Sequence, residues 1–356
     1  MLDMAPADNR DIAPDSAPPQ RVAWIEPDES FAALCHKRIA RMGKTRGLYY
    51  FWGRAEAKKR LYNAVRIDGK PLSYHATGSE YYRGFLIAVG IVAGLALLLL
   101  GVIAYAWLFG ITPDVNGITW TRYLAVVPTI VLLGVMAWRG IARDLQRTGW
   151  AGSAFDLIGS PWRYAGLHLA TLLALPLTLG WIIPYRQARL QREVIGAVRH
   201  GGVACAFDGS ARPLYARFAV IWFATLLIYL AIVAVLGQTI GPAIVSAGKH
   251  GNWSALLAAD TLPWLIAASA PGLIAFGFVH AWYRACTLNA FAPHIAFGTA
   301  RLVLALPPWR YAANTMVCIA IRLGSLTLYA PVADARAMRF FVRHADLTAD
   351  TAHTAN

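Results

Sequence analysis

The sequence predicts an all-α polytopic membrane protein whose six apolar helical segments are built from internal repeats. Apolar residues make up 57% of the 356 residues and charged residues only 15%, whereas soluble domains are about 45–50% apolar and about 25% charged. The mean hydropathy is correspondingly high, at +0.46. Lys and Arg, which give a net charge of +14, lie between the apolar stretches, as in membrane proteins with basic cytoplasmic loops. This placement argues against a nucleic-acid-binding domain, which clusters its charge on one soluble face.

Both ends of the chain are predicted to be disordered tails. Residues 1–30 are rich in Ala, Pro and Asp and hold few large apolar side chains, so they cannot bury enough surface to become ordered. They also lack the basic and apolar regions of a secretory signal peptide. Residues 346–356 form the second tail, which leaves 31–345 as the repeat-built transmembrane domain. Residues 31–46 are compatible with a helix but too charged to cross a bilayer, and we interpret them as a solvated helix, with a surface-lying helix as the alternative.

Six stretches approach the roughly 20 apolar residues that a helix needs to cross a bilayer. They are 84–109, 123–141, 164–185, 217–240, 262–283 and 311–331. None of them contains Asp or Glu. Tryptophans such as Trp107, Trp138 and Trp264 lie near the ends of these stretches, as in the aromatic belts of membrane proteins.

The charge bias conflicts with six complete crossings. Loops 142–163 and 186–216 are both basic and should both be cytoplasmic, although one apolar segment lies between them. Either all six segments span and loop 186–216 lies outside against the charge rule, or the third and sixth segments enter the membrane and return. Pro176 and Gly180 supply a break in the third segment, because Pro and Gly disrupt helix interiors. Both alternatives place the C-terminus in the cytoplasm, with the basic region before residue 84.

Three copies of one pattern recur near residues 47–85, 180–218 and 323–344. Each copy combines Gly, aromatic residues and spaced basic residues, and the third aligns with the second through the dipeptide Leu-Gly at 323–324 and 179–180. The identical run Pro-Trp-Arg-Tyr-Ala precedes the second and third copies, in a register slipped by three residues. Agreement in order along the chain indicates duplication. The alternative is that basic, aromatic-flanked membrane ends resemble one another.

The repeat resembles a known family. Leu179-Gly180 followed by apolar residues, Pro184-Tyr185, spaced arginines and Val-Arg-His-Gly-Gly at 198–202 is similar to the bacterial YjgN family of inner-membrane proteins, whose domain has no assigned function. The resemblance covers roughly residues 47–345, although the first copy carries Phe51-Trp52 where Pro-Trp is usual. It implies a multi-pass protein of the bacterial inner membrane and supplies no catalytic residues. With the charge bias, both termini are expected in the cytoplasm.

The repeated basic ends are the candidate binding sites. Clustered Lys and Arg attract anionic lipid headgroups by about 1 kcal/mol per charge near a membrane surface. The candidate residues for lipid or substrate binding are Arg54, Lys58, Arg189, Arg192, Arg322 and Arg336, with Pro176 and Gly180 at the helix break. The simpler alternative is that the basic residues only set topology and that Arg322 snorkels or caps the backbone beside a turn. His168 and His280, within apolar segments, are interpreted as interfacial hydrogen-bonding residues.

No catalytic, metal or cofactor motif is visible in the sequence. It lacks a Gly-rich phosphate loop, a Gly-x-Ser-x-Gly elbow and a His-Glu-x-x-His pair, and its four cysteines have no metal-like spacing. We therefore expect membrane lipids as partners and no cofactor. The function stays open between transport or permeation of a small or lipid-like molecule through the repeat interface, a structural or lipid-organising role that holds anionic headgroups, and, third, an intramembrane enzyme. A polar cavity would favour transport or catalysis, and a solid apolar core a structural role.

Overall fold

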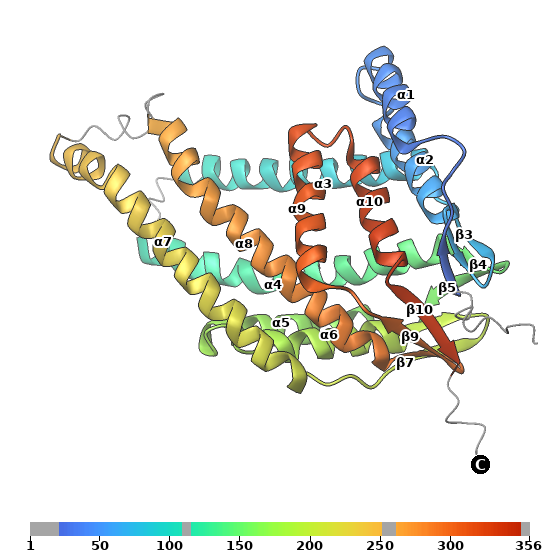
Figure 1. Cartoon of the computed structure of the whole chain (residues 1–356). Helices are drawn as coiled ribbons and strands as arrows, with labels where there is room; N and C mark the ends of the chain where they lie inside the picture. The colour runs from blue at the N-terminus through green and yellow to red at the C-terminus, as the bar shows by residue number, and fades with distance from the viewer. Residues whose placement is uncertain (1–20, 109–114, 251–260, 350–356) are drawn as a thin grey trace, which may run out of the picture.

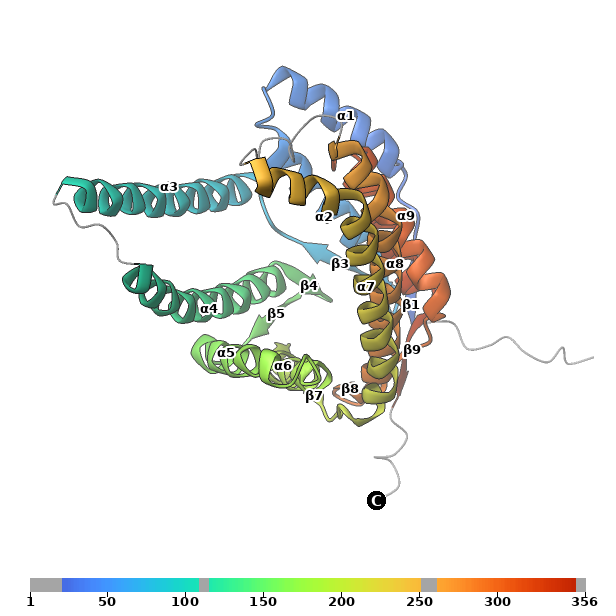
Figure 2. The same cartoon turned by 90° about the vertical axis from the view of Figure 1, so that its left-hand side faces the viewer.

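The computed structural model describes residues 21–108, 115–250 and 261–349. Within these ranges, ten short strands form one antiparallel sheet in the order of the sequence. The strands are β1 (Val22–Trp24), β2 (Val65–Ile67), β3 (Lys70–Tyr74), β4 (Thr148–Trp150), β5 (Ser153–Leu157), β6 (Val198–His200), β7 (Val203–Phe207), β8 (Ile295–Phe297), β9 (Ala300–Leu304) and β10 (Ala345–Ala349). The helices are α1 (Phe31–Lys44), α2 (Tyr50–Asn63), α3 (Gly78–Leu108), α4 (Val115–Gln146), α5 (Pro161–Leu177), α6 (Ile183–Ala197), α7 (Arg212–His250), α8 (Thr261–Phe291), the 3-10 helix η2 (Ala292–His294), α9 (Pro308–Gly324) and α10 (Ala330–Val342). Figures 1 and 2 show the long helices α3, α4, α7 and α8 reaching away from the strands.

Neighbouring strands are connected alternately by a tight turn and by a pair of helices. Three of the tight turns hold pairs of residues with positive φ: Asp68-Gly69, Ala151-Gly152 and Gly201-Gly202. Type I′ hairpin turns require this backbone, and Gly adopts it without strain. Because consecutive strands are antiparallel, all the helix pairs of the described chain are connected at the same end of the strands. The tight turns lie at the opposite end of the strands.

The sheet has an apolar face and a polar face. On the apolar face, rings two strands apart touch: the ring centroids of Trp150 and His200 are 5.5 Å apart, and those of His200 and Phe297 are 5.8 Å apart. Side chains converge in this way where a sheet is concave. Alternate residues point to the other, convex face, which carries the directly opposed pair Asp156 and Arg199. Aromatic rings therefore line the concave side of the middle strands.

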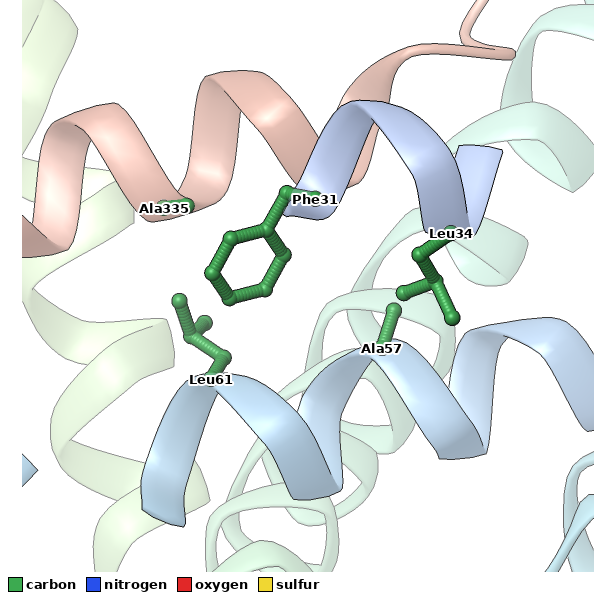
Figure 3. Packing of buried hydrophobic residues seen from close by; sticks show 5 residues of the cluster. All are labelled: Phe31, Leu34, Ala57, Leu61 and Ala335. Carbon is green, nitrogen blue, oxygen red and sulfur yellow. The ribbon is translucent and has the colours of Figure 1, made fainter. Parts of the chain in front are cut away.

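Curling of the sheet brings the two ends of the described chain together. The backbone N–H of Arg21, just before β1, donates to Oδ1 of Asp346 in β10 at 2.9 Å. The helices above these strands share a core in which the Phe31 ring points between α2 and α10 (Figure 3). The buried members of this core are Phe31, Leu34, Ala57, Leu61 and Ala335. Burying side chains as large as Phe31 and Leu61 stabilises the closure by about 1.5–3 kcal/mol each.

Each of the three repeat copies begins at or near the turn of a short helical hairpin, and these hairpins are α1–α2, α5–α6 and α9–α10. In each turn, one backbone N–H donates to the carbonyl five residues earlier: that of Gly47 (2.9 Å), Gly180 (2.9 Å) and Thr327 (2.6 Å). All three residues have positive φ, as in the left-handed caps that end many helices. The sequence alignment of the third copy at the turn is wrong by three residues, because Gly324 is the last residue of α9 and Thr327 takes the place of Gly180.

The expected all-α fold with six apolar membrane segments is wrong. The described residues hold a ten-stranded sheet, and among them one helical segment, Arg212–Gln238 of α7, is long and apolar enough to cross a membrane. Segments 164–185 and 311–331 are each split by a hairpin turn, and both ends of each hairpin return to the sheet. The strands escaped prediction because each has only three to five residues, too few for an alternating pattern to stand out.

The predicted tails, and two of the segments between predicted apolar stretches, lie partly outside the described residues. Residues 1–20 and 350–356 are outside them. However, β1 lies within the predicted tail 1–30, and β10 begins one residue before the predicted tail 346–356. The inner part of each predicted tail is therefore a sheet strand. Residues 110–122, between the first and second predicted apolar stretches, fall partly on the undescribed residues 109–114. Residues 241–261, between the fourth and fifth predicted stretches, fall partly on the undescribed residues 251–260.

Candidate anion-binding pocket

A cavity of about 310 Å³ lies between the hairpins α1–α2 and α9–α10. We call it the basic pocket, and its polar lining residues are Arg38, Tyr50, Arg54, Lys58, Arg322, Thr327 and Asp334. These residues come from the two ends of the described chain, which curling of the sheet brings together. The lining thus holds four cationic side chains and one carboxylate.

Arg38 is the buried cation of the pocket. It lies on α1 and is 4% exposed, with its guanidinium 4.7 Å from the centre of the Tyr50 ring. Its stem packs against Gly53 of α2, where an added Cβ would lie 2.8 Å from Cγ and Cδ of Arg38. Within the described part of the chain, Nε of Arg38 has no hydrogen-bond partner. A buried charge without a hydrogen-bonded counter-charge is costly, so this position favours an anion from outside the chain.

Arg54 and Lys58 project from α2 one helical turn apart. The Arg54 guanidinium lies 5.4 Å from the centre of the Tyr81 ring, a cation–π contact that leaves its charge unneutralised. Lys58 Nζ is 3.6 Å from Oδ1 of Asp144 on α4. The spacing of four residues places both cations on one face of α2, and that face lines the basic pocket.

Arg322 and Asp334 form an ion pair across the α9–α10 hairpin. Both side chains are partly exposed, at 45% and 42%, so water screens the pair. Asp334 is the carboxylate of the pocket lining, and its partner is Arg322. The pocket therefore keeps an excess of positive charge, carried by Arg38 and Arg54.

A hydroxyl network behind the pocket fixes the position of Lys58. Its Nζ donates to the Tyr74 hydroxyl at 3.4 Å. The Tyr74 hydroxyl donates to Oδ1 of Asp144 at 3.2 Å and lies 2.7 Å from the Tyr81 hydroxyl. Burial, and then the contacts with Tyr81 and Asp144, raise the pKa of Tyr74 well above its ordinary value. The hydroxyl thus stays protonated and remains a donor at physiological pH.

The structure assembles three of the predicted site residues and disperses the others. Arg54, Lys58 and Arg322 line the basic pocket. Arg336 lies on α10 and donates from Nε to Oδ1 of Asn314 at 2.8 Å, where it lines a neighbouring cavity.

The remaining predicted residues belong to the middle hairpin α5–α6. Arg192 donates from Nη2 to the Gly209 carbonyl at 2.9 Å, and the buried Nε of Arg189 has no partner in the described residues. Pro176 lies in the last turn of α5, and Gly180 forms the hairpin turn.

Sequence reasoning missed Arg38, because residues 31–46 were interpreted as a solvated helix. The buried residues of α1 are Phe31, Leu34, Cys35 and Arg38, which recur at the spacing of one helix face. A cation that continues an apolar face was the signal that could have identified it. Asp334 was missed because its ion pair with Arg322 depends on the hairpin turn between them.

The described residues offer no alternative metal chemistry here. Among them, no group of three or more His, Cys, Asp or Glu side chains could hold a metal ion. The four cysteines are free, and three of them are buried. The lining of the basic pocket instead suits an anion with several acceptor oxygens, because guanidinium groups present a fixed fork of donors.

Comparison with known proteins identifies a family and no function. A family model described as "Bacterial protein of unknown function (DUF898)" matches residues 45–355. This match confirms the resemblance to the YjgN family that the repeat motifs indicate. The chain matches no curated protein and no solved structure.

Proposed function

We propose that this chain, which belongs to the bacterial DUF898 family, is a membrane-inserted protein that binds a phosphate-bearing lipid headgroup in its basic pocket. The observation that carries the proposal is Arg38, a buried arginine whose Nε has no partner among the described residues. It lines a cavity with three further cations and a single carboxylate. Phosphate supplies the charge and the acceptor oxygens that these donors lack.

Membrane insertion is supported by apolar surface that the molecule leaves uncovered. Large apolar side chains of the long helices are widely exposed, among them Leu97 on α3 (69%), Leu227 on α7 (66%) and Ile274 on α8 (63%). Such side chains gain about 1.5–3 kcal/mol each when removed from water. We therefore place the long helices in the bilayer of the bacterial inner membrane.

The charges of the sheet support its placement in the cytoplasm. All the helix pairs of the described chain are connected at one end of the strands. The tight turns, the start of β1 and the end of β10 therefore lie at the other end, away from the helices. The convex face of the strands carries arginines such as Arg66, Arg199 and Arg301. Basic segments next to membrane helices are retained on the cytoplasmic side. Both ends of the described chain would then be cytoplasmic.

Headgroup binding is better supported than permeation along the sheet axis. On the middle strands, the concave face of the sheet is lined by rings such as Trp150, Phe155 and Phe297, which surround His200. An ion or polar solute would find few partners on such a face. A volume of about 310 Å³ for the basic pocket lies at the small end of ligand sites, which span about 300–1,000 Å³, and suits a headgroup better than a whole lipid.

The test is retention of anionic lipid by purified protein. The wild type and the variants Arg38→Met and Arg54→Gln would be equilibrated with mixed phosphatidylglycerol and phosphatidylcholine micelles. The lipid molecules that stay bound to each protein would then be counted by native mass spectrometry. Loss of one charge-assisted hydrogen bond should lower retention of phosphatidylglycerol about tenfold. The matched control is Arg163→Gln, which removes an arginine whose side chain is 75% exposed.

Two outcomes would overturn the proposal. One is unchanged retention in both Arg38→Met and Arg54→Gln, provided that the variants elute as the wild type does in size-exclusion chromatography. The other is displacement of all retained lipid by millimolar inorganic phosphate, which would identify the pocket as a site for free phosphate. Using two variants keeps the test valid if Arg38→Met alone fails to fold.

A further inference from the structure

Two adjoining cavities lie between the middle hairpin and the helices α7 and α8, away from the basic pocket. One measures about 490 Å³ and is almost wholly apolar, with Phe218, Trp222, Ile232, Leu273 and Phe276 in its lining. The other measures about 590 Å³ and is lined in part by Gln187, Gln191, Arg284 and Thr287. His280 lines both cavities. We call the pair the amphipathic groove.

The lining residues follow single helix faces, so the two cavities lie one after the other along these faces, with His280 at their junction. On α8 they are residues 273, 276, 280, 284 and 287, a spacing that keeps them on one side of the helix. On α6 the lining passes from Ile183 to Gln187 and Gln191. Both helices run toward the sheet, where they are followed by β8 and β6. The apolar end of the groove therefore lies farther from the sheet than the polar end.

Specific contacts hold the walls of the groove. Trp222 donates from Nε1 to the Leu179 carbonyl at 2.8 Å, which fastens the α5–α6 turn to α7. Tyr283 donates from its hydroxyl to Oε1 of Gln187 at 3.2 Å, which ties α8 to α6. Helices α7 and α8 meet closely at Gly272, where an added Cβ would lie 2.4 Å from Cγ1 of Ile232. The groove is thus a defined shape beside the helix break that the sequence predicted.

We infer that the amphipathic groove binds a single-chain amphiphile with a carboxylate head, of the class of long-chain fatty acids. The apolar end offers rings and branched side chains to the chain of the ligand. The polar end offers the Arg284 guanidinium and the side-chain amides of Gln187 and Gln191, which can all donate to a carboxylate. Its lining contains no Asp or Glu, so an anion meets no like charge there. The inference is independent of the basic pocket.

Photolabelling in a bilayer separates this site from ordinary contact with lipid tails. The full chain would be placed in nanodiscs of phosphatidylcholine and labelled with a palmitic acid that carries a diazirine near its methyl end. We expect saturable labelling of peptides around Leu226 to Tyr229 in α7 and Leu273 to Phe276 in α8. Unlabelled palmitic acid should compete about tenfold better than hexadecanol, because the alcohol lacks the charge that Arg284 pairs with.

Matched variants test the two ends of the groove. Thr225→Trp fills the apolar end, where Thr225 lines the cavity, and should lower saturable labelling at least about tenfold. Leu227→Trp adds the same ring to an outward position of α7 that is 66% exposed and should leave labelling unchanged. Arg284→Gln should abolish the preference for acid over alcohol, whereas Arg310→Gln, an exposed arginine, should keep it.

The inference fails if labelling is unsaturable and spread over the exposed face of α7, because that pattern describes bulk lipid. It also fails if Thr225→Trp labels like Leu227→Trp, or if Arg284→Gln keeps the preference for the acid. Elution of each variant as a single species in size-exclusion chromatography checks that it is folded. The result for Arg284→Gln remains decisive if the larger Thr225→Trp change disturbs the helices.

Discussion

The end hairpins, α1–α2 and α9–α10, and the middle hairpin, α5–α6, have a similar backbone conformation but carry different side chains at matching positions. Arg54 and Lys58 follow the turn at Gly47 by the same number of residues as Gln187 and Gln191 follow the turn at Gly180. In the first copy these positions line the basic pocket, and in the second they line the polar end of the amphipathic groove. The repeat therefore supplies a similar frame for a cavity, and the residues placed in it set the charge of that cavity.

The neighbours of the hairpins differ as well. The first and last hairpins pack on each other through the core of Phe31 and Ala335, because the curled sheet brings them together. The middle hairpin meets α7 and α8 instead, through contacts such as that of Trp222 with Leu179. Position around the sheet thus decides which cavity each copy can form.

The largest expected effect is an all-or-none result for the sidedness of the middle hairpin. Cys35, Cys205, Cys286 and Cys318 would be replaced by Ala, and one new cysteine would be introduced as a labelling sensor. It would be either Ser153→Cys in β5, which precedes α5–α6 in the chain, or Val203→Cys in β7, which follows it. Both should react with a membrane-impermeant thiol reagent only in inside-out vesicles, because β5 and β6 pair directly. Reaction of the two sensors from opposite sides would show that this hairpin spans, unlike the end hairpins.

The native Cys205 is a poorer sensor for that experiment. Burial raises the pKa of its thiol above the ordinary value, which lowers the fraction of reactive thiolate. Ser153 and Val203 are exposed, so cysteines at those positions should react at ordinary rates. Intact cells labelled under the same conditions give the matched reading from outside.

The next largest effect concerns the closure between the end hairpins. Phe31→Ala should lower the free energy of unfolding by about 3–5 kcal/mol, because it leaves a cavity in a buried core. Leu177→Ala, at the end of α5 in the middle hairpin and 86% exposed, should change it by less than about 0.5 kcal/mol. Denaturant midpoints in detergent, followed by circular dichroism, measure both. Equal effects would mean that the end hairpins are no more tightly packed than the middle one.

An exchange of the matching residues tests the comparison directly. The double variant Gln187→Arg, Gln191→Lys should raise retention of phosphatidylglycerol by the middle hairpin about tenfold, because it adds charged donors to the polar end of the groove. Native mass spectrometry after exchange into mixed micelles measures the number of lipids retained. The control Ala204→Lys, Ala206→Lys adds two charges to exposed positions of β7. A similar gain in the control would mean that net charge, and not the frame of the hairpin, attracts the lipid.

The smallest effect is a pH dependence at the tight turn beside the closure. Asp68 accepts from Nε of Arg21 at 2.7 Å, and this hydrogen bond holds the pKa of Asp68 below its ordinary value of 3.8. A lowered folded-state pKa adds stability above the unfolded-state value, and that stability is lost as the pH falls through the folded-state value. Gly201 takes the matching place in the middle copy and has no side chain to titrate.

Asp68→Asn should therefore cost less than about 1 kcal/mol at neutral pH, because the pair is exposed to water. The difference from the wild type should shrink below a pH of about 4. Thermal melting between pH 3 and 7 measures it, with Asp156→Asn as the control for loss of a surface carboxylate. A constant difference across this range would show that the Asp68 charge adds nothing to the closure.

Local features of the fold were predictable, and pairing was not. The helical hairpins follow from runs such as 161–177 and from the turn at Gly180, which are contained in a few consecutive residues. Strands such as Val65–Ile67 and Val198–His200 look like basic loop ends, because three residues carry little pattern of their own. Their hydrogen bonds go to strands that the sequence does not mark as partners. A fold dominated by helices was therefore expected where a sheet organises the molecule.

The candidate site was predictable only in its exposed cations. Arg54, Lys58 and Arg322 stood out because they interrupt or flank apolar stretches. Arg38 did not, because its burial depends on Gly53 of another helix and on closure of the sheet. The polar end of the groove was invisible for the same reason, since neutral residues such as Gln187 and Thr287 gain meaning only beside Arg284.

The sequence by itself determined the family, the repeat, the apolar helices and the basic character of the first copy. These properties depend on composition and on spacings of a few residues, which a linear chain carries without reference to its fold. The tertiary structure alone decided which hairpins meet, which arginine is buried and which cations keep a counter-charge. Those outcomes depend on burial and on distances between segments far apart in the chain, and a curled sheet that brings the first strand close to the last sets both.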